Sequence, residues 1–206
     1  MRKIVLMMLC IAVLGSTAFA KDIVIGGGGL FGLTFEEYHY PQTSTEYFAT
    51  THEVKETAYG GYVFFGLTRF MEASIAVFVN NNAVVWKWFD YNVNKPMEQP
   101  KKDYLGQQVG VSLYGKYPFV LSKIVLFPTV GLDLEGTNGS LDLFGGVGGG
   151  LDYFFPQFNQ RLFIRVQAIY RAGFLYIYKY KDIKESFTTD KLAHGPLFKL
   201  GLGWVY

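Results

Sequence analysis

The final ten residues, Leu197-Phe198-Lys199-Leu200-Gly201-Leu202-Gly203-Trp204-Val205-Tyr206, alternate between two kinds of side chain. One set is large and apolar and consists of Phe198, Leu200, Leu202, Trp204 and Tyr206; the other contains Lys199 and two glycines. Because successive side chains of a β-strand point to opposite faces, this segment predicts a strand with one apolar face. Aromatic residues at its end are typical of a strand that finishes at a membrane interface.

The same alternation recurs along the chain and is separated by turn-forming residues. It is found at about residues 22–35, 57–68, 72–80, 105–113, 123–134, 142–153 and 162–172, where glycine blurs the two faces of the first two segments. With the last segment these make eight strands. Lipid leaves no partner for an open sheet edge, so apolar strands of this kind must close on themselves. We therefore predict an all-β fold, a closed antiparallel transmembrane β-barrel of about eight strands with up-and-down topology.

Ten strands are the alternative to eight, because residues 83–91 could form a further pair of strands instead of a loop.

The lengths of the connections between strands support the barrel with either number of strands. Those at 36–56, 80–103 and 175–191 are long, 135–140 is brief, and those near 68–71, 115–121 and 154–161 are short. Outer-membrane barrels have short periplasmic turns and longer outer loops. An even number of strands then puts both chain ends on the periplasmic side.

Residues 1–20 have the pattern of an export signal. Arg2 and Lys3 precede a short apolar run, and Ser16-Thr17-Ala18-Phe19-Ala20 ends with the small-x-small pattern of a cleavage site. We expect cleavage after Ala20, which leaves residues 21–206 as the outer-membrane barrel. Lipid attachment at Cys10 is not favoured, because bulky residues precede it and the apolar run continues beyond it.

Composition excludes several classes of function. Without Arg2 and Lys3 the 19 basic residues become 17, which equals the 17 acidic residues, so no electrostatic attraction to nucleic acid is expected. The only cysteine is removed with the signal, which excludes disulfides and cysteine-based metal sites. The chain is 50% hydrophobic, yet after the signal no apolar run reaches the length of a membrane-spanning helix.

Charged residues fall on the face opposite the apolar one. These are Glu72, Lys123, Asp133, Asp142, Asp152, Arg165, Arg171 and Lys199. A cationic side chain facing lipid at the bilayer midplane would cost about 2–4 kcal/mol, so this face must point into the barrel. Because the signs are mixed, we predict a compensating lumen cluster of Glu72, Lys123, Asp152, Arg165 and Lys199.

Glycine and proline add two expectations about the wall. The glycine blocks 26–29 and 145–150 would weaken ordinary strands but relieve crowding in a narrow barrel. Pro128 cannot donate to a strand ladder, so it predicts a bulge.

The chain resembles the small outer-membrane barrels of the OmpA/OmpX/OmpW type. The resemblance rests on the signal, the eight amphipathic segments, the long outer loops and the ending Gly203-Trp204-Val205-Tyr206, and it covers the whole mature chain. It implies that Phe198, Leu200, Leu202, Trp204 and Tyr206 are read by the barrel-assembly machinery. Such proteins usually end in Phe, where this chain has Tyr206.

Three other features could indicate binding or catalysis, but their surroundings do not favour it. Asp22-Ile23-Val24-Ile25 followed by Gly27-x-Gly29-x-x-Gly32 matches a dinucleotide fingerprint, but a proline and aromatics follow it where the chemistry needs a helix. His39 and His52 lie near Glu36, Glu37 and Glu53, a set that is more typical of a solvated loop than of a metal site. His194 has no nearby serine that would complete a catalytic triad.

We therefore expect a barrel with a structural or surface-interaction role and a largely plugged polar lumen, without enzyme activity, metal or cofactor. A narrow pore for small or apolar solutes is the alternative, and a lipid-modifying enzyme is third. The expected location is the cell outer membrane. The expected partners are outer-membrane lipid, the assembly machinery and an extracellular partner bound through loops 36–56, 80–103 and 175–191, but no nucleic acid.

Overall fold

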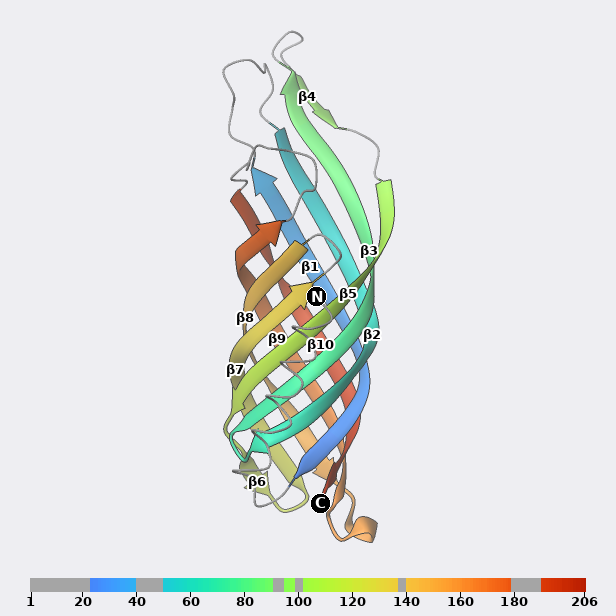
Figure 1. Cartoon of the computed structure of the whole chain (residues 1–206), viewed down its shortest axis with the longest axis vertical. Helices are drawn as coiled ribbons and strands as arrows, with labels where there is room; N and C mark the ends of the chain where they lie inside the picture. Colours follow the sequence, from blue (N-terminus) through green and yellow to red (C-terminus); the bar gives the residue numbers. More distant parts are fainter. Residues whose placement is uncertain (1–22, 40–49, 91–94, 99–101, 137–139, 179–189) are drawn as a thin grey trace.

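The computed structural model describes residues 23–39, 50–90, 95–98, 102–136, 140–178 and 190–206 (Figure 1). The expected signal and its cleavage site lie outside this range. The elements are β1 (Val24–His39), β2 (Thr50–Thr68), β3 (Met71–Asp90), β4 (Lys95–Glu98), β5 (Lys102–Lys116), β6 (Phe119–Leu121), β7 (Ile124–Gly136), β8 (Ser140–Phe154), the 3-10 turn η1 (Pro156–Phe158), β9 (Leu162–Tyr178) and β10 (Asp190–Val205). In the described part of the chain, no helix has the length and apolarity needed to cross a membrane.

Eight of the strands close into a ring. Their order around it is β1, β2, β3, β5, β7, β8, β9 and β10, and β10 pairs with β1. Every pairing is antiparallel, and each strand lies beside its neighbours in the sequence, as Figure 1 shows. The predicted closed, up-and-down, eight-stranded barrel is therefore confirmed.

The two remaining strands are additions to the wall. Residues 83–90 continue β3, and β4 pairs with its end along the same edge that β5 uses lower down. These residues therefore extend the barrel and do not add a pair of strands to its ring. The short β6 pairs with the first residues of β7 inside the predicted joint at 115–121.

The predicted outer loops are shorter than expected, because strands continue into them. β1 runs to His39 and β2 begins at Thr50, while β9 runs to Tyr178 and β10 begins at Asp190. The boundaries 36–56, 80–103 and 175–191 are therefore wrong as loop boundaries. Outside lipid a strand needs no apolar face, so its alternation disappears from the sequence while its backbone pairing continues.

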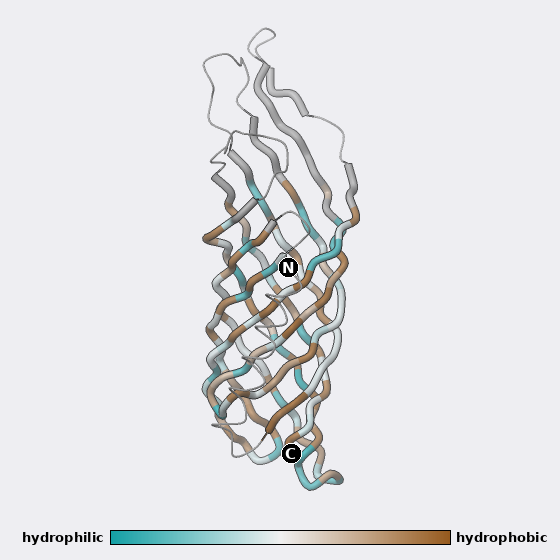
Figure 2. The backbone as a smooth tube through the Cα atoms, viewed as in Figure 1, coloured by the Kyte–Doolittle hydropathy of each residue, from teal (hydrophilic) through white to brown (hydrophobic). Residues whose placement is uncertain are grey.

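The exposure of side chains is inverted with respect to a soluble protein. On β9, Val166 is 53% exposed and Tyr170 is 52% exposed, whereas Arg165, which precedes Val166, and Arg171, which follows Tyr170, are buried. Apolar and polar positions alternate along the barrel wall in Figure 2. A closed barrel with an apolar exterior and a charged interior is the arrangement of a membrane-spanning barrel.

The glycines make room for large side chains inside the barrel. A Cβ atom on Gly150 would lie 2.5 Å from Cζ of Phe127, and one on Gly146 would lie 2.9 Å from Cγ2 of Ile169. A Cβ on Gly203 would collide with the ring of Phe163. The glycine-rich strands thus allow large residues on neighbouring strands to fill a narrow interior.

Pro128 forms no bulge, contrary to the sequence-based expectation. It pairs with Gly149 in a continuous register between β7 and β8. On its other side the pairing with β5 ends at Thr129 and the pairing with β6 begins at Leu126. Pro128 therefore lies in a gap of the ladder, where its missing N–H group is not needed.

Candidate functional site in the barrel lumen

The lumen is crossed by a buried ion pair centred on Arg165. This side chain is fully buried, and its Nε and Nη2 atoms donate to the two carboxylate oxygens of Asp152, each at 2.7 Å. Its Nη1 atom donates to Glu72 on β3. A guanidinium that makes a bidentate contact and a third hydrogen bond is held in one orientation.

Lys116 completes this group of charges. Its Nζ atom lies 2.9 Å from Oε2 of Glu72, and it comes from β5, the neighbour of β3. Two cations and two anions then balance within one layer. We call Glu72, Lys116, Asp152 and Arg165 the lower cluster.

Aromatic rings enclose the lower cluster. The guanidinium carbon of Arg165 lies 4.3 Å from the ring centroid of Phe64, 5.0 Å from that of Phe127 and 5.3 Å from that of Phe163. The faces of aromatic rings attract cations, and more strongly where water is absent. The rings come from β2, β7 and β9, so they pack around the charge from several sides of the barrel.

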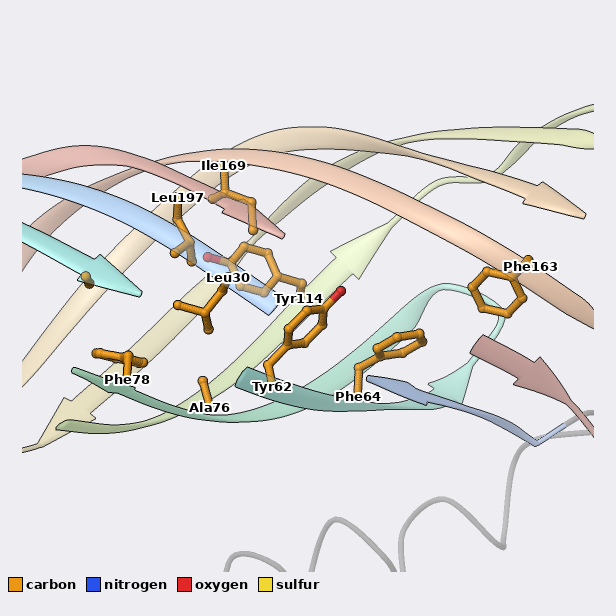
Figure 3. Packing of buried hydrophobic residues seen from close by; sticks show 10 residues of the cluster. Leu30, Tyr62, Phe64, Ala76, Phe78, Tyr114, Phe163, Ile169 and Leu197 are labelled. Carbon is orange, nitrogen blue, oxygen red and sulfur yellow. The ribbon is translucent and has the colours of Figure 1, made fainter. Parts of the chain in front are cut away.

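Lys199 occupies the next layer. It is 4% exposed, and its Nζ atom lies 5.4 Å and 5.5 Å from the ring centroids of Tyr62 and Tyr114. The same atom donates to Oγ of Ser74 at 3.3 Å. The Tyr114 hydroxyl in turn donates to Asp133. Figure 3 shows Tyr62 and Tyr114 among the apolar side chains that fill this part of the barrel.

A second ion pair lies in a third layer. Arg171 donates from Nη1 to Glu135 on β7, and its guanidinium carbon lies 5.0 Å from the ring centroid of Phe144. All three side chains are buried. We call Arg171 and Glu135 the upper cluster. Charged layers thus recur along the barrel axis, with rings packed around them.

A cavity of about 620 Å³ opens below the lower cluster. Its wall includes Val24, Val125 and Val205, and Lys116, Asp152 and Arg165 line it as well. It lies at the end of the barrel where β1 begins and β10 finishes (Figure 1). The cavity is a vestibule that reaches the lower cluster.

The structure brings together three of the five residues that the sequence places in one cluster. Glu72, Asp152 and Arg165 are in direct contact, and Lys199 lies inside the lumen in the layer above. Lys123 is not in the lumen: it is exposed in the tight turn between β6 and β7. The predicted strand began at residue 123, whereas β7 begins at Ile124 and residue 123 belongs to the turn.

Sequence reasoning missed Lys116 and the rings of Phe64 and Phe127. Lys116 lies two residues beyond inward-facing Tyr114, so the alternation of β5 could have identified it. The joint was instead expected to begin at residue 115. Phe64 lies in a strand whose faces glycine obscures.

The terminal strand has the predicted face toward the outside. Phe198, Leu200 and Leu202 are 46%, 56% and 53% exposed, while Tyr206 is 67% exposed. The Trp204 ring lies 6.3 Å from that of Phe158 in η1. Since β10 pairs with both β1 and β9, this strand closes the barrel. Its reading by an assembly machinery stays a prediction.

The three histidines lie on three different strands, β1, β2 and β10. Tyr38 pairs with His52 and His39 with Thr51 across β1 and β2, so their backbones lie in paired strands; their side chains are outside the described part. His194 lies on the outward face, where its Nδ1 atom is 2.7 Å from the Tyr170 hydroxyl. The described residues contain no cluster of three candidate metal ligands.

No family model matches the sequence, and no curated protein matches it. Among solved structures, the chain is similar to the outer membrane protein OprG from Pseudomonas aeruginosa, with 11% identity over 91% of this chain and 97% of that one, and a TM-score of 0.47. It is also similar to the outer membrane protease OmpT from Escherichia coli, with 9% identity, 90% and 96% coverage and a TM-score of 0.45. Neisserial surface protein A is similar as well, with 10% identity over 89% of this chain and 97% of that one, and a TM-score of 0.39. Similarity this low says nothing about the role of this chain.

Proposed function

We propose that the protein is an outer-membrane barrel with a closed lumen and a structural or surface-interaction role. The observation that carries the proposal is the ion pair of Arg165 with Glu72 and Asp152, which crosses the interior and is enclosed by three aromatic rings. An eight-stranded barrel is just wide enough for side chains to fill it. A continuous ion path would have to disrupt this layer.

The energetic cost of opening that path supports a closed state. Breaking a buried ion pair by removing one partner costs about 3–5 kcal/mol, because a charge is left without compensation in a dry environment. Ions would have to pass both the lower cluster and the upper cluster of Arg171 and Glu135. A neutral solute that passes through the lumen carries no charge that could replace the lost partner of either ion pair.

The outer end of the barrel supports a role at the surface. β3 has 20 residues, and a strand needs only about 9–11 to cross a membrane. Since β3 begins beside the short turn at 69–70, the excess projects from the opposite side, where Figure 1 shows β3 and β4 above the other strands. Among the described pairings, β7 pairs with β5 only from Val109 to Lys116, so residues 102–108 extend beyond β7.

The composition of this projection suits binding. Trp86, Trp88 and Tyr104 lie on its strands, and aromatic residues are those that most often anchor protein partners. We infer an extracellular partner of the projection formed by residues 83–90, 95–98 and 102–108. Deletion of residues 87–101 should leave a heat-modifiable, folded barrel and abolish attachment of producing cells to each other or to protein-coated surfaces. Attachment that is unchanged by the deletion would rule out this role.

A narrow pore is the second candidate, and one observation favours it. Among the described residues, the buried side-chain atoms in the lumen that have no hydrogen-bond partner include the Tyr62 hydroxyl, Asn80 Oδ1, Gln108 Oε1, Thr129 Oγ1 and Arg171 Nε. Buried polar groups are normally satisfied, and a file of water would satisfy these. Swelling of liposomes that contain the protein in small sugars or amino acids tests this function. Swelling at the rate of protein-free liposomes is expected if the lumen is closed.

We assign no catalytic step to the protein. His194, the residue considered for one, faces outward and hydrogen bonds to Tyr170. A lipid-modifying activity would appear as transfer or release of an acyl chain when the folded barrel is incubated with phospholipid. We expect none, and His194→Gln serves as the matched control if any is found.

A further inference from the structure

A group of polar and aromatic side chains interrupts the apolar exterior of the barrel. Phe35 on β1 is directly opposite Lys55 on β2 and opposite His194 on β10. Nζ of Lys55 lies 5.8 Å from the centroid of the Phe35 ring, and the rings of Phe35 and His194 are 5.9 Å apart. With Tyr170 of β9, which stacks on His194 at 6.0 Å, they form what we call the outer patch.

The cationic member of this patch is unusual for its face. Among strand residues whose side chains the structure describes, Lys55 is the only lysine or arginine on the outward face of the barrel; Lys116, Arg165, Arg171 and Lys199 point inward. An outward lysine at the bilayer midplane would be strongly unfavourable. Lys55 must therefore lie where the apolar band ends.

The spacing along β10 gives the height of the patch. Ten residue steps separate His194 from Trp204 at the periplasmic end, and at about 3.3 Å per residue they span about 33 Å along the strand. With a tilt of about 40°, this corresponds to about 25 Å along the barrel axis, the height of the apolar band of such barrels. The outward residues between them, Leu202, Leu200, Phe198 and Pro196, are all apolar. The outer patch thus lies level with the headgroups of the outer leaflet.

The chemistry of the patch fits a phosphate group. Lys55 is an exposed cation, and a compact ammonium is a common ligand of phosphate. If the Tyr170 hydroxyl donates to Nδ1 of His194, the imidazole proton lies on Nε2, which then donates outward. Phe35 and Tyr170, 41% and 52% exposed, offer flat apolar surface to the acyl chains below. Cation, donor and ring surface are together at one height.

We propose that the outer patch binds the phosphorylated sugar headgroup of an outer-leaflet glycolipid of the lipid A type. This inference rests on the proposed outer-membrane location and orientation, which put Lys55 and His194 on the side of the outer leaflet. The bound lipid holds Lys55 through its phosphate, and its acyl chains cover Phe35 and Tyr170. One lipid molecule would then bridge β9, β10, β1 and β2, the strands on both sides of the barrel-closing pair.

The test uses the full mature barrel, folded in detergent and incubated with lipid A carrying two phosphates. Native mass spectrometry then measures the fraction of barrel that retains lipid. Lys55→Gln and His194→Gln are compared with Lys123→Gln, which removes an exposed lysine from the opposite end of the barrel. A cation at a charged membrane surface contributes about 1 kcal/mol, so Lys55→Gln should weaken retention about five-fold. His194→Gln should also weaken it, and Lys123→Gln should have no effect.

Dephosphorylated lipid A supplies the second comparison. It should be retained equally and weakly by the wild type and by Lys55→Gln. Equal retention of the phosphorylated lipid by the wild type and by Lys55→Gln would overturn the proposal, as would an equal loss with Lys123→Gln. Retention of phosphatidylglycerol that is as strong as that of lipid A would show a general anionic surface and would also overturn it. Heat-modifiable migration of every variant separates these outcomes from a failure of the barrel itself.

Discussion

Arg165 and Glu72 form an ion pair across the full width of the barrel. They are 93 residues apart in the sequence, and their strands, β9 and β3, are opposite members of the ring of eight. No local interaction brings them together, so the pair forms only when the barrel closes. The contact thus fills the lumen and also links two strands on opposite sides of the barrel.

Removing Arg165 should destabilise the barrel strongly. Arg165→Ala strands Asp152 and part of Glu72 in the interior, so we expect a loss of about 3–5 kcal/mol in the free energy of unfolding. Val166→Ala is the matched control, because Val166 is the next residue and faces outward. Denaturant unfolding from lipid vesicles, followed by tryptophan fluorescence, measures both. If Arg165→Ala left the free energy of unfolding unchanged while Val166→Ala lowered it strongly, the inward and outward faces of β9 would be reversed.

The charge pair should also show strong coupling. Asp152→Ala combined with Arg165→Ala should cost less than the two single changes added together, since the double variant leaves one fewer buried charge uncompensated. The same unfolding measurement gives the coupling. Additive effects would indicate that the two groups do not interact in the membrane.

Packing of Phe163 against Gly203 predicts a rescue. A methyl group added by Gly203→Ala collides with the Phe163 ring, and overpacking of this kind typically costs about 1–3 kcal/mol. Phe163→Leu should recover part of that loss, although it also removes a ring from Arg165. If Gly203→Ala folds with unchanged stability, the ring does not fill the space as described.

The orientation of the barrel can be tested with single cysteines, because residues 21–206 contain none. A membrane-impermeant maleimide should label Lys95→Cys, in β4, on intact cells. Ser122→Cys, in the turn before β7, should be labelled only after the outer membrane is permeabilised. The opposite pattern of labelling would invert the topology.

Assembly should depend on the terminal strand. Deletion of residues 204–206 removes the outward rings at the periplasmic end of β10, so the chain should be exported but accumulate uninserted and sensitive to protease. Tyr206→Phe, which keeps the ring, should insert normally. Normal insertion of the shortened chain would show that these residues do not direct assembly.

The sequence was sufficient for the membrane-facing part of the wall. Residues 162–172 and 197–206 alternate because one face meets lipid and the other meets charge, and both faces are as predicted. Outside lipid that constraint ends, so the extensions of β1, β2 and β3 could not be recognised from alternation. The strands at 22–35 and 57–68 were predicted, but glycine obscured which of their residues face inward. The position of Phe64 beside Arg165 was missed for that reason.

The sequence predicted that charges of opposite sign meet in the lumen, but it did not identify all the residues that meet there. Alternation identifies inward charges, whereas contacts between them depend on stagger around the ring, which a single sequence does not contain. Lys199 is therefore in the layer above Arg165, and Lys116, not Lys123, is the lysine that joins the lower cluster through Glu72. A turn of two residues at 122–123 was enough to remove Lys123 from the interior.

Conductance of the folded wild-type barrel in planar bilayers tests the central claim most directly. With the lower and upper clusters intact, addition of the protein should produce no discrete conductance steps at moderate voltage in salt solution. Arg165→Ala with Arg171→Ala, which breaks both ion pairs, is the comparison that shows whether a path can be opened. Stable, reproducible conductance steps from the wild type would contradict the closed lumen and make the protein a pore.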